Sequence, residues 1–315
     1  MKVLVTGAAG FIGSHLSHNL LNKGYDVIGI DNFNNFYSPE VKRNNIKKLS
    51  KHKSFKFIEG SFCNKETVLK LFLEKPDTVA HLGAMANVRY SVKHPDLFVD
   101  TNVVGTNNLL EFACKNNVKN FVFASTSSIY GQREKTPFIE TDSTDLPLAP
   151  YPATKKAGEL LGHAYHNMNK LNFTALRFFN VYGPAGRPDM MPYIVTEKLV
   201  EDEEITLFDN GKMFRDWTYI DDIVSGVTLA LENPLGYEIL NLGRGEPVEM
   251  TEFLEITQNL TGKKAIINVI DAPESEPKIT CASIDKARKL LGYDPKTNLK
   301  DGLSNFWDWY KENII

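Results

Sequence analysis

A glycine-rich turn directly after the first short apolar run is the feature that most narrows how this chain folds. The run Val3–Val5 leads into Thr6–Gly13, and a helical pattern follows. Gly7 permits a tight turn, Gly10 lets the backbone approach a pyrophosphate, and Gly13 lets the helix pack closely on the strand. The amino end of such a helix offers free N–H groups and the positive end of its dipole to phosphates. The pattern therefore predicts a dinucleotide-binding turn.

Alternating strands and helices continue this pattern through the first half of the chain. Candidate helices lie near residues 12–23, 65–74, 96–116 and 152–169. The short apolar runs between them predict buried strands, which are Val3–Val5, Val27–Ile30, Phe55–Ile58, Thr78–His81, Phe121–Ala124 and Phe173–Arg177. This alternation predicts an α/β fold of the Rossmann type, in which a doubly wound parallel sheet is covered by helices on both faces.

The second half of the chain changes in character after Asn180, where turn-rich segments appear. We predict that residues 1–177 form the dinucleotide-binding Rossmann domain and that residues 218–242 rejoin its sheet. Residues 178–217 and 243–315 then form a smaller C-terminal α/β substrate domain. A ligand cleft is expected between the two domains, at the carboxyl ends of the strands.

Composition and charge exclude several classes of protein. The net charge of −3 provides no field that attracts nucleic acid or an anionic membrane, and the basic stretch from Lys42 to Lys53 is predicted to be a solvated loop or helix. No apolar run approaches the ~20 residues that span a bilayer, and the first residues lack the apolar core of a signal peptide. Three separated cysteines without a CxxC pair predict reduced thiols and no metal site. We therefore expect a cytoplasmic protein.

An acidic residue, Asp31, ends the second predicted strand. Its carboxylate can accept hydrogen bonds from the adenosine ribose hydroxyls and repel a 2′-phosphate, which predicts NAD rather than NADP as the cofactor. The alternative is a turn residue that touches no ligand.

A tyrosine and a lysine one helical turn apart, Tyr151 and Lys155, open the last helix of the first half. Pro152 suits the first helical position, and the spacing lets both side chains face one cleft. A tyrosine titrates near ~10 and is a poor base at neutral pH, but nearby positive charge favours the phenolate and makes it a usable proton acceptor. The alternative is a chance occurrence of this spacing in a helix.

Hydroxyl residues cluster at the end of the fifth predicted strand, at Thr126, Ser127 and Ser128. They would point over the carboxyl edge of the sheet, where Thr126 can hydrogen-bond the same substrate oxygen as Tyr151. The alternative is a cluster that only caps the following turn.

Together these residues resemble the extended short-chain dehydrogenase/reductase family, and the resemblance covers essentially the whole chain. The features that carry it are the glycines at 7, 10 and 13, Asp31, His81–Ala84, Asn102–Thr106, Thr126, Tyr151 with Lys155, and Arg215–Asp222. Within that family the chain is most similar to nucleotide-sugar 4-epimerases. Two further stretches, Ala86–Ser91 and Tyr182–Met190, are similar to UDP-glucuronate 4-epimerases.

The resemblance implies a role for each matching residue. The residues implied to hold NAD are Gly7, Gly10, Phe11, Ile12, Gly13, Asp31, Asn32, Leu82, Ala84 and Lys155. Tyr151, Thr126 and Lys155 are implied to be catalytic, through oxidation at C4 to a 4-keto sugar that is reduced again from its other face. The residues implied to bind the nucleotide sugar are Arg89, Ser127, Ser128, Asn180, Arg187 and Arg215, with Arg187 near a sugar carboxylate. The alternative for Arg187 is a surface pair with Asp189.

The resemblance also implies a homodimer, formed by the helices near residues 96–116 and 152–169. Apolar positions compatible with such packing are Leu97, Val104, Leu160, Leu161 and Tyr165.

Departures from the family pattern bear on the reaction. Ser128 stands where the 4,6-dehydratases and UDP-glucuronate decarboxylases of this family carry a glutamate, which favours epimerisation. Ser61 stands in place of an adenine-contacting aspartate, and Pro273–Pro277 lacks the arginine that binds the diphosphate. Two alternatives stay open. One is another nucleotide-sugar redox enzyme on this scaffold, such as a UDP-glucose or UDP-N-acetylglucosamine 4-epimerase or a 4-oxidase, and the other is a non-catalytic NAD-dependent sensor.

Overall fold

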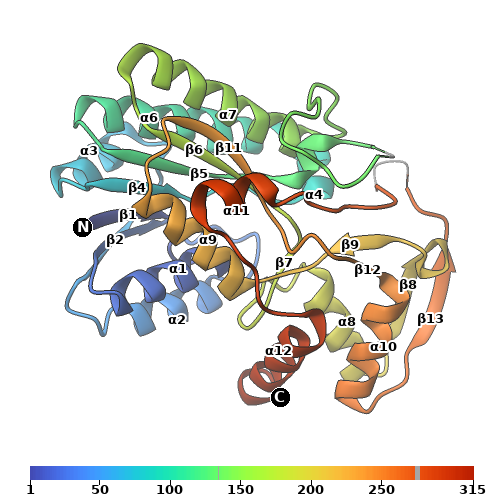
Figure 1. Cartoon of the computed structure of the whole chain (residues 1–315). Coiled ribbons are helices and arrows are strands. Elements are labelled where there is room, and N and C mark those ends of the chain that lie inside the picture. Colours follow the sequence, from blue (N-terminus) through green and yellow to red (C-terminus); the bar gives the residue numbers. More distant parts are fainter. Residues whose placement is uncertain (134, 274–276) are drawn as a thin grey trace.

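A parallel sheet of seven strands lies at the centre of the part of the chain that the computed structural model describes, residues 1–133, 135–273 and 277–315 (Figure 1). The strands lie in the order β11-β6-β5-β4-β1-β2-β3. They are β1 (Lys2–Thr6), β2 (Asp26–Asp31), β3 (Phe55–Glu59), β4 (Thr78–His81), β5 (Asn120–Thr126), β6 (Phe173–Phe178) and β11 (Tyr237–Leu242). The six strands predicted for the first half are confirmed, with small shifts at their ends. The order reverses between β1 and β4, and ligands bind outside the carboxyl ends of strands at such a point.

Helices cover both faces of the sheet (Figure 1). Those on one face are α3 (Lys65–Leu73), α6 (Gly105–Lys115) and α7 (Pro150–Asn169). Those on the other face are α1 (Phe11–Asn22), α2 (Pro39–Leu49) and α9 (Ile220–Glu232). The predicted doubly wound α/β fold is confirmed.

The helix predicted as one unit over residues 96–116 is divided in the structure. It consists of α5 (Pro95–Val99), a π-helical turn (Asp100–Val104) and α6. The π-helical turn contains Asn102, which is buried and donates from Nδ2 to the carbonyl oxygen of Met85 at 2.9 Å and to Thr154 Oγ1 at 3.0 Å. Periodicity cannot reveal such a turn, because one extra residue per turn is a local adjustment that is frequent at functional sites.

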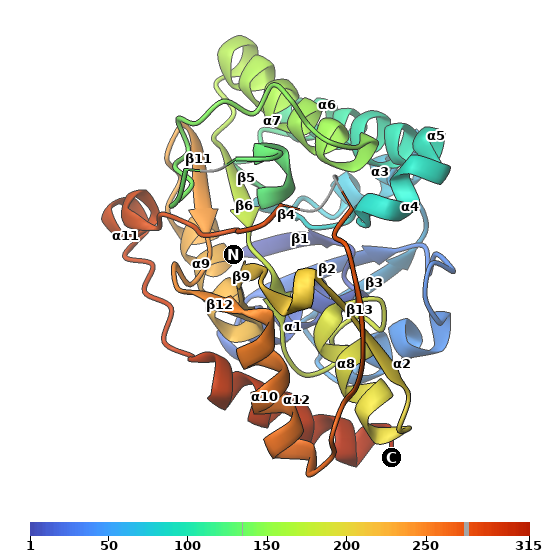
Figure 2. The same ribbon diagram turned by 90° about the vertical axis from the view of Figure 1, so that its right-hand side faces the viewer.

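A smaller unit of short elements packs beside the sheet, below and to the right of it in Figure 1, and Figure 2 shows it from another side. Its strands pair as β7 (Val181–Tyr182) with β10 (Thr218–Tyr219), β9 (Phe214–Asp216) with β12 (Pro247–Glu249), and β8 (Glu204–Phe208) with β13 (Ile266–Ile270). Its helices are α8 (Met191–Val200), α10 (Met250–Thr261) and α12 (Leu299–Asn313), and α11 (Asp285–Leu291) packs near β11.

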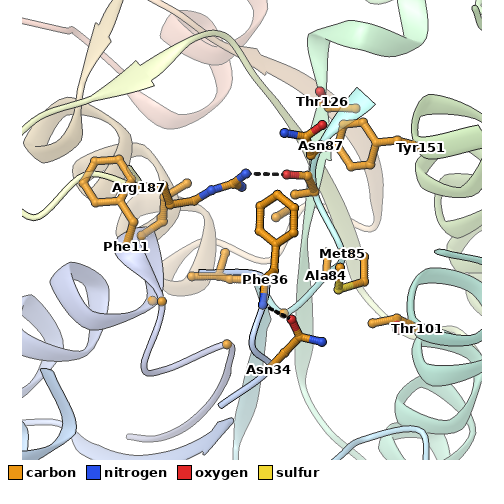
Figure 3. Close-up of a pocket in the computed structure, with 18 of the residues that line it drawn as sticks. Phe11, Asn34, Phe36, Ala84, Met85, Asn87, Thr101, Thr126, Tyr151 and Arg187 are labelled. Carbon is orange, nitrogen blue, oxygen red and sulfur yellow. Dashed lines mark hydrogen bonds between the residues drawn. The ribbon is translucent and has the colours of Figure 1, made fainter. Parts of the chain in front are cut away.

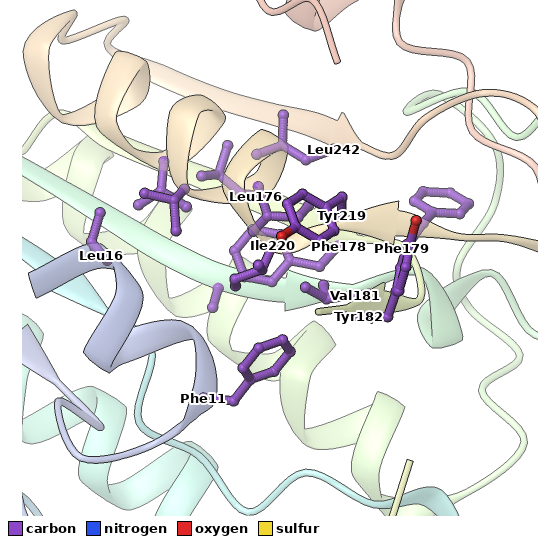
Figure 4. Close-up of a cluster of buried hydrophobic side chains, with 14 of the residues drawn as sticks. Phe11, Leu16, Leu176, Phe178, Phe179, Val181, Tyr182, Tyr219, Ile220 and Leu242 are labelled. Atoms are coloured by element: carbon purple, nitrogen blue, oxygen red, sulfur yellow. The ribbon is translucent and has the colours of Figure 1, made fainter. Parts of the chain in front are cut away.

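One hydrophobic cluster runs from under the sheet into this smaller unit (Figure 4). Phe11 of α1, Leu176 of β6 and Leu242 of β11 share it with Tyr182 and Ile220. The strand β11 and the helix α9, from the segment expected to rejoin the sheet, pack against β6. Because the core is continuous, the division of the chain into two domains at the predicted boundaries stays a proposal.

None of the described helices combines the length and apolar character that crossing a bilayer requires. In the same residues, no group of three or more histidine, cysteine, aspartate or glutamate side chains is arranged to hold a metal ion. The three cysteines, Cys63, Cys114 and Cys281, are free thiols.

A buried ion pair ties α7 to the sheet. Arg177 of β6 donates from Nε and Nη2 to the two carboxylate oxygens of Glu159 on α7, each at 2.9 Å, and the pair is almost fully buried. Ser125 Oγ of β5 donates to Glu159 at 2.7 Å. Arg177 Nη1 donates to the Tyr130 hydroxyl at 2.9 Å, which in turn donates to Asn241 Oδ1 of β11 at 2.7 Å. The network therefore joins α7 to three neighbouring strands.

We expect Glu159→Ala to lower the free energy of unfolding by about 3–5 kcal/mol, because Arg177 would remain buried without its counter-charge. Urea unfolding followed by circular dichroism measures the loss. Glu111→Ala is the control, since Glu111 pairs with Lys65 and Lys115 at the surface and exposed pairs contribute at most about 1 kcal/mol. Equal losses in the two variants would contradict this role for the buried pair.

Candidate active site

A cavity of about 590 Å³ lies at the carboxyl ends of the strands, where the strand order reverses. The predicted cofactor residues that line it are Gly7, Gly10, Phe11, Ile12, Gly13, Asp31, Asn32, Leu82, Ala84 and Lys155. The predicted catalytic and substrate residues that line it are Tyr151, Thr126, Ser127, Ser128, Asn180 and Arg187. The fold therefore brings together residues that are far apart in the sequence, and their individual roles stay predictions.

The turn between β1 and α1 presents backbone to this cavity. Gly7 has φ of 68°, a left-handed conformation that favours glycine. A Cβ atom at Gly13 would overlap the carbonyl oxygen of Gly7, so the helix can approach the turn only without a side chain there. Gly10 is the N-cap residue of α1, and within the described residues no side chain caps this end. The N–H groups of the first turn thus fit a pyrophosphate.

Asp31 lies at the end of β2, within reach of the glycine turn. Its carboxylate accepts hydrogen bonds from the N–H of Phe33 at 2.9 Å and of Ala9 at 3.2 Å. Burial raises the pKa of Asp31, while these two N–H groups and the charge of Lys42 act against that rise. Lys42 corrects the sequence prediction of a solvated basic stretch, because its side chain is buried, lines the cavity and lies 4.3 Å from the ring centroid of Tyr37.

The catalytic tyrosine predicted from the sequence is partly buried at the start of α7. Its backbone N–H donates to Ser91 Oγ at 3.1 Å, which fixes the first turn of the helix against α4 (Val88–Lys93). Figure 3 shows the Tyr151 ring directed toward Thr126. Burial raises the pKa of Tyr151, and the hydrogen bond with Thr126 and the positive charge of Arg187 act in the opposite direction. The site thus holds groups that favour the phenolate.

The structure shows the capping contact of Thr126, and its contact with a substrate stays a prediction. Its Oγ1 accepts a hydrogen bond from the N–H of Ser128 at 3.2 Å and caps the short 3₁₀ turn Ser127–Tyr130. The same side chain lines the cavity and bonds with Tyr151. Capping fixes the orientation of the hydroxyl, and this is compatible with a role toward a ligand.

Lys155 lies one turn after Tyr151 and is almost fully buried. Burial lowers the pKa of Lys155 to about 7, and the nearby charge of Glu159 acts against that fall. The ammonium lies 4.3 Å from the ring centroid of Phe123. A lysine with this pKa exchanges its proton near neutral pH, as expected in an active site.

Arg187 is paired with Asp189, as the alternative interpretation expected, but the pair lines the cavity and does not lie on an open surface. Arg187 donates from Nε to Asp189 Oδ1 at 2.9 Å and from Nη2 to Oδ2 at 2.6 Å. Nη2 also donates to the carbonyl oxygen of Ala86 at 2.5 Å. Burial acts to raise the pKa of Asp189, but Arg187 outweighs it and lowers the pKa. Asp189 is therefore ionised at neutral pH.

Two predicted substrate residues lie outside the lining of this cavity. Arg89 on α4 lies over the ring of Phe208, with its guanidinium carbon 5.4 Å from the ring centroid. Arg215 on β9 is largely buried and donates from Nη1 to the carbonyl oxygen of Phe214 at 3.0 Å. Their roles stay predictions. Residues 274–276, within the segment predicted to lack the diphosphate arginine, lie outside the described residues.

Several lining residues were given no site role in the sequence analysis. They come from the loop after β2 and the first turns of α2, the segment from β4 into the start of α4, the π-helical turn and the loop before α8. These residues are Asn34, Phe36, Tyr37, Lys42, Met85, Asn87, Val88, Asp100, Thr101, Asp189 and Met190. Asn87, Val88, Asp189 and Met190 lie in the two stretches that resemble UDP-glucuronate 4-epimerases, which was the available signal for them. For the others the available signal was their closeness to a predicted strand or helix.

Comparison with known proteins assigns the family. Residues 3–243 match the model of the NAD dependent epimerase/dehydratase family. The chain belongs to this family. It is 43% identical over 313 residues to the UDP-glucuronate 4-epimerase of Thermodesulfobacterium geofontis, covering 99% of this chain and 96% of that protein.

Solved structures of family members are also similar over their whole length. The UDP-glucuronic acid 4-epimerase of Bacillus cereus, in complex with UDP-glucuronic acid and NAD, is 39% identical with a TM-score of 0.93 over 99% of both chains. The UDP-glucose 4-epimerase of Thermotoga maritima, with UDP-glucose, is 31% identical with a TM-score of 0.92 over 100% of both chains. The predicted family and its NAD cofactor are confirmed, and the protein is an enzyme of the nucleotide-sugar epimerase family.

We expect Tyr151→Phe to reduce kcat about 10²–10⁴-fold, the usual cost of removing a positioned general base, and to leave NAD bound. Turnover assays and the nucleotide content of the purified protein measure the two effects. Tyr165→Phe is the matched control, because that hydroxyl lies on the same helix and donates to Asn107 Oδ1 at 3.1 Å. A Tyr151 variant with nearly normal kcat would rule out this residue as the base.

Proposed function

We propose that the enzyme inverts C4 of UDP-glucuronate to give UDP-galacturonate. The observation that carries the proposal is the guanidinium of Arg187, which lines the same cavity as Tyr151 and acts on its pKa. Arginine's planar fork suits a carboxylate, and the glucuronate carboxylate is attached at C5, next to the reacting C4. The relatives from Thermodesulfobacterium geofontis and Bacillus cereus, both named as epimerases of this substrate, support the proposal.

The mechanism follows from the groups around Tyr151. The chemistry that NAD supplies when bound is reversible hydride exchange with C4 of the sugar. Tyr151 accepts the proton of the 4-hydroxyl as the 4-keto sugar forms, and it returns the proton after that sugar has turned its other face to the cofactor. Thr126 stabilises the phenolate by a hydrogen bond. The turn Gly7–Gly13, Asp31 and Lys155 would hold the cofactor.

The carboxylates of the cavity favour epimerisation over dehydration. In the described part of the chain, the acidic residues that line it are Asp31, Asp100 and Asp189. Asp31 accepts from the glycine turn, and Asp189 is paired with Arg187. Ser128 follows Thr126 by two residues, so a hydroxyl stands where an elimination would use an acid. The proton transfers that the site supports are those of Tyr151.

A second candidate is epimerisation of UDP-glucose. Asp189 neutralises the charge of Arg187, so the cavity is also suited to a neutral sugar. The similarity to the Thermotoga maritima UDP-glucose 4-epimerase favours this candidate as well.

Product analysis by NMR after incubation with UDP-, GDP-, dTDP- and CDP-sugars tests the proposal. We expect UDP-glucuronate to yield UDP-galacturonate without accumulation of NADH. Arg187→Ala should reduce kcat/KM for UDP-glucuronate at least 10-fold more than for UDP-glucose. Arg187→Lys keeps the charge without the planar fork, so its preference for UDP-glucuronate should lie between those of the wild type and Arg187→Ala. Stoichiometric NADH would indicate a net 4-oxidase. Equal use of both sugars, unchanged in the variants, would leave the substrate unassigned.

We also propose a homodimer that is formed through α7 and the helices before it. Val104 and Leu160 are exposed, at 45% and 59%, on segments that contact one another. Leu161 and Tyr165 instead pack partly against the core, and Leu97 lines the cavity. The exposed apolar surface on these helices therefore includes fewer of the predicted interface residues than the sequence indicated.

Light scattering at micromolar concentration should give the mass of a dimer, and Leu160→Glu should shift it toward the monomer, because a charge in an apolar interface costs desolvation energy. Leu73→Glu is the control, because Leu73 on α3 is also exposed, at 68%, and this variant should leave the mass unchanged. A monomeric wild-type protein would contradict the proposal.

A further inference from the structure

The side chain of Asn87 links two parts of the cavity wall. Its Oδ1 accepts a hydrogen bond from the N–H of Tyr90 at 2.9 Å and so caps α4. Its Nδ2 donates to Asp189 Oδ2 at 3.0 Å. The amide oxygen thus accepts one hydrogen bond while the amide nitrogen donates another. Only a side chain that both accepts and donates satisfies both partners.

The carboxylate of Asp189 is the point where these contacts meet Arg187. Its Oδ2 accepts from Arg187 Nη2 and from Asn87 Nδ2, while Oδ1 accepts from Arg187 Nε. The carbonyl oxygen of Ala86, the neighbour of Asn87, accepts from Nη2 as well. Arg187 is therefore held by residues 86 and 87 both directly and through Asp189. Figure 3 shows its guanidinium directed toward Asn87.

One nitrogen of Arg187 remains available in this arrangement. Nε and Nη2 are occupied, whereas Nη1 has no hydrogen-bond partner among the described residues. A fixed guanidinium with one unsatisfied edge can accept a carboxylate from a ligand without losing its pair with Asp189. The orientation of that edge depends on where Asp189 is held.

We propose that Asn87 is a positioning residue that, through Asp189, sets the orientation and local charge of Arg187 and so determines how strongly the cavity prefers a sugar that carries a carboxylate. The inference rests on the proposed use of an acidic sugar. An amide at position 87 leaves one anion beside one cation. A carboxylate there would place two anions against Arg187, and the excess negative charge would repel an acidic sugar but not a neutral one.

The choice of variant must preserve α4. The hydrogen bond from the Tyr90 N–H to Asn87 stabilises α4, and Ser91 of α4 accepts from the backbone N–H of Tyr151. Asn87→Ala would therefore also disturb the start of α7. Asn87→Asp and Asn87→Ser keep a capping oxygen, since aspartate and serine cap about as well as asparagine. Aspartate has no donor for Asp189, and serine replaces the two ends of the amide by a single hydroxyl on a shorter side chain.

The chain offers a matched control in Asn298. This residue caps α12 by accepting from the N–H of Asp301 at 2.9 Å, and its Nδ2 donates to Asp301 Oδ2 at 2.7 Å. Asn298→Asp therefore makes the same chemical change at a helix cap that does not line the cavity.

The test measures dissociation constants of UDP-glucuronate and UDP-glucose for the NAD-loaded enzyme by calorimetry, with thermal unfolding as a check on the fold. Asn87→Asp should weaken UDP-glucuronate at least 10-fold and change UDP-glucose less than 2-fold, while Asn87→Ser should weaken UDP-glucuronate several-fold. Asn298→Asp should change neither sugar. The double variant Asn87→Asp with Asp189→Asn exchanges the two groups, restores a single anion, and should recover part of the selectivity.

Equal effects of Asn87→Asp on the two sugars, or no effect on either, would overturn the proposal, as would a double variant no more selective than the single one. Binding is measured apart from turnover, so the two proposals fail differently. An enzyme that binds UDP-glucuronate selectively but forms no UDP-galacturonate would refute the proposed reaction and still support the role of Asn87.

Discussion

The buried pair of Arg177 and Glu159 is the interaction on which the arrangement of the active site depends. It holds α7 against β5, β6 and, through Tyr130, β11, and α7 carries both Tyr151 and Lys155 at its amino end. Burying an ion pair costs desolvation energy, which is offset only when the pair has favourable geometry and its remaining polar atoms are hydrogen-bonded. The same carboxylate acts on Lys155, whose pKa it keeps from falling further.

Around α7, much of the cavity wall comes from turns and loops between the regular helices and strands. The glycine turn supplies backbone N–H groups because side chains are excluded there, and the π-helical turn directs Asn102 to Met85 and Thr154. The helix α4 is braced at both ends of this region, by Asn87 on Asp189 and by Ser91 on Tyr151. Arg187, through Asp189, and the predicted base Tyr151 are thus both connected by hydrogen bonds to one short helix.

The pKa shifts in the cavity are caused by burial, and a few neighbouring groups oppose them. Burial raises the pKa of Tyr151 and lowers that of Lys155, so both groups are shifted toward their neutral forms. Thr126 and Arg187 oppose the shift at Tyr151. Asp189 in turn offsets the positive charge of Arg187.

The sequence by itself determined the family, the sheet and the cofactor, because these depend on local rules. The glycines at 7, 10 and 13, the apolar strands and the pair Tyr151 and Lys155 have spacings that only a few structures satisfy. Tertiary structure alone decided the burial of Lys42, the division of the helix after residue 95, and the contacts of Asn87 with Asp189 across 102 positions of the chain. These features depend on which segments meet at the edge of the sheet, and long-range proximity leaves no periodic signal in a single sequence.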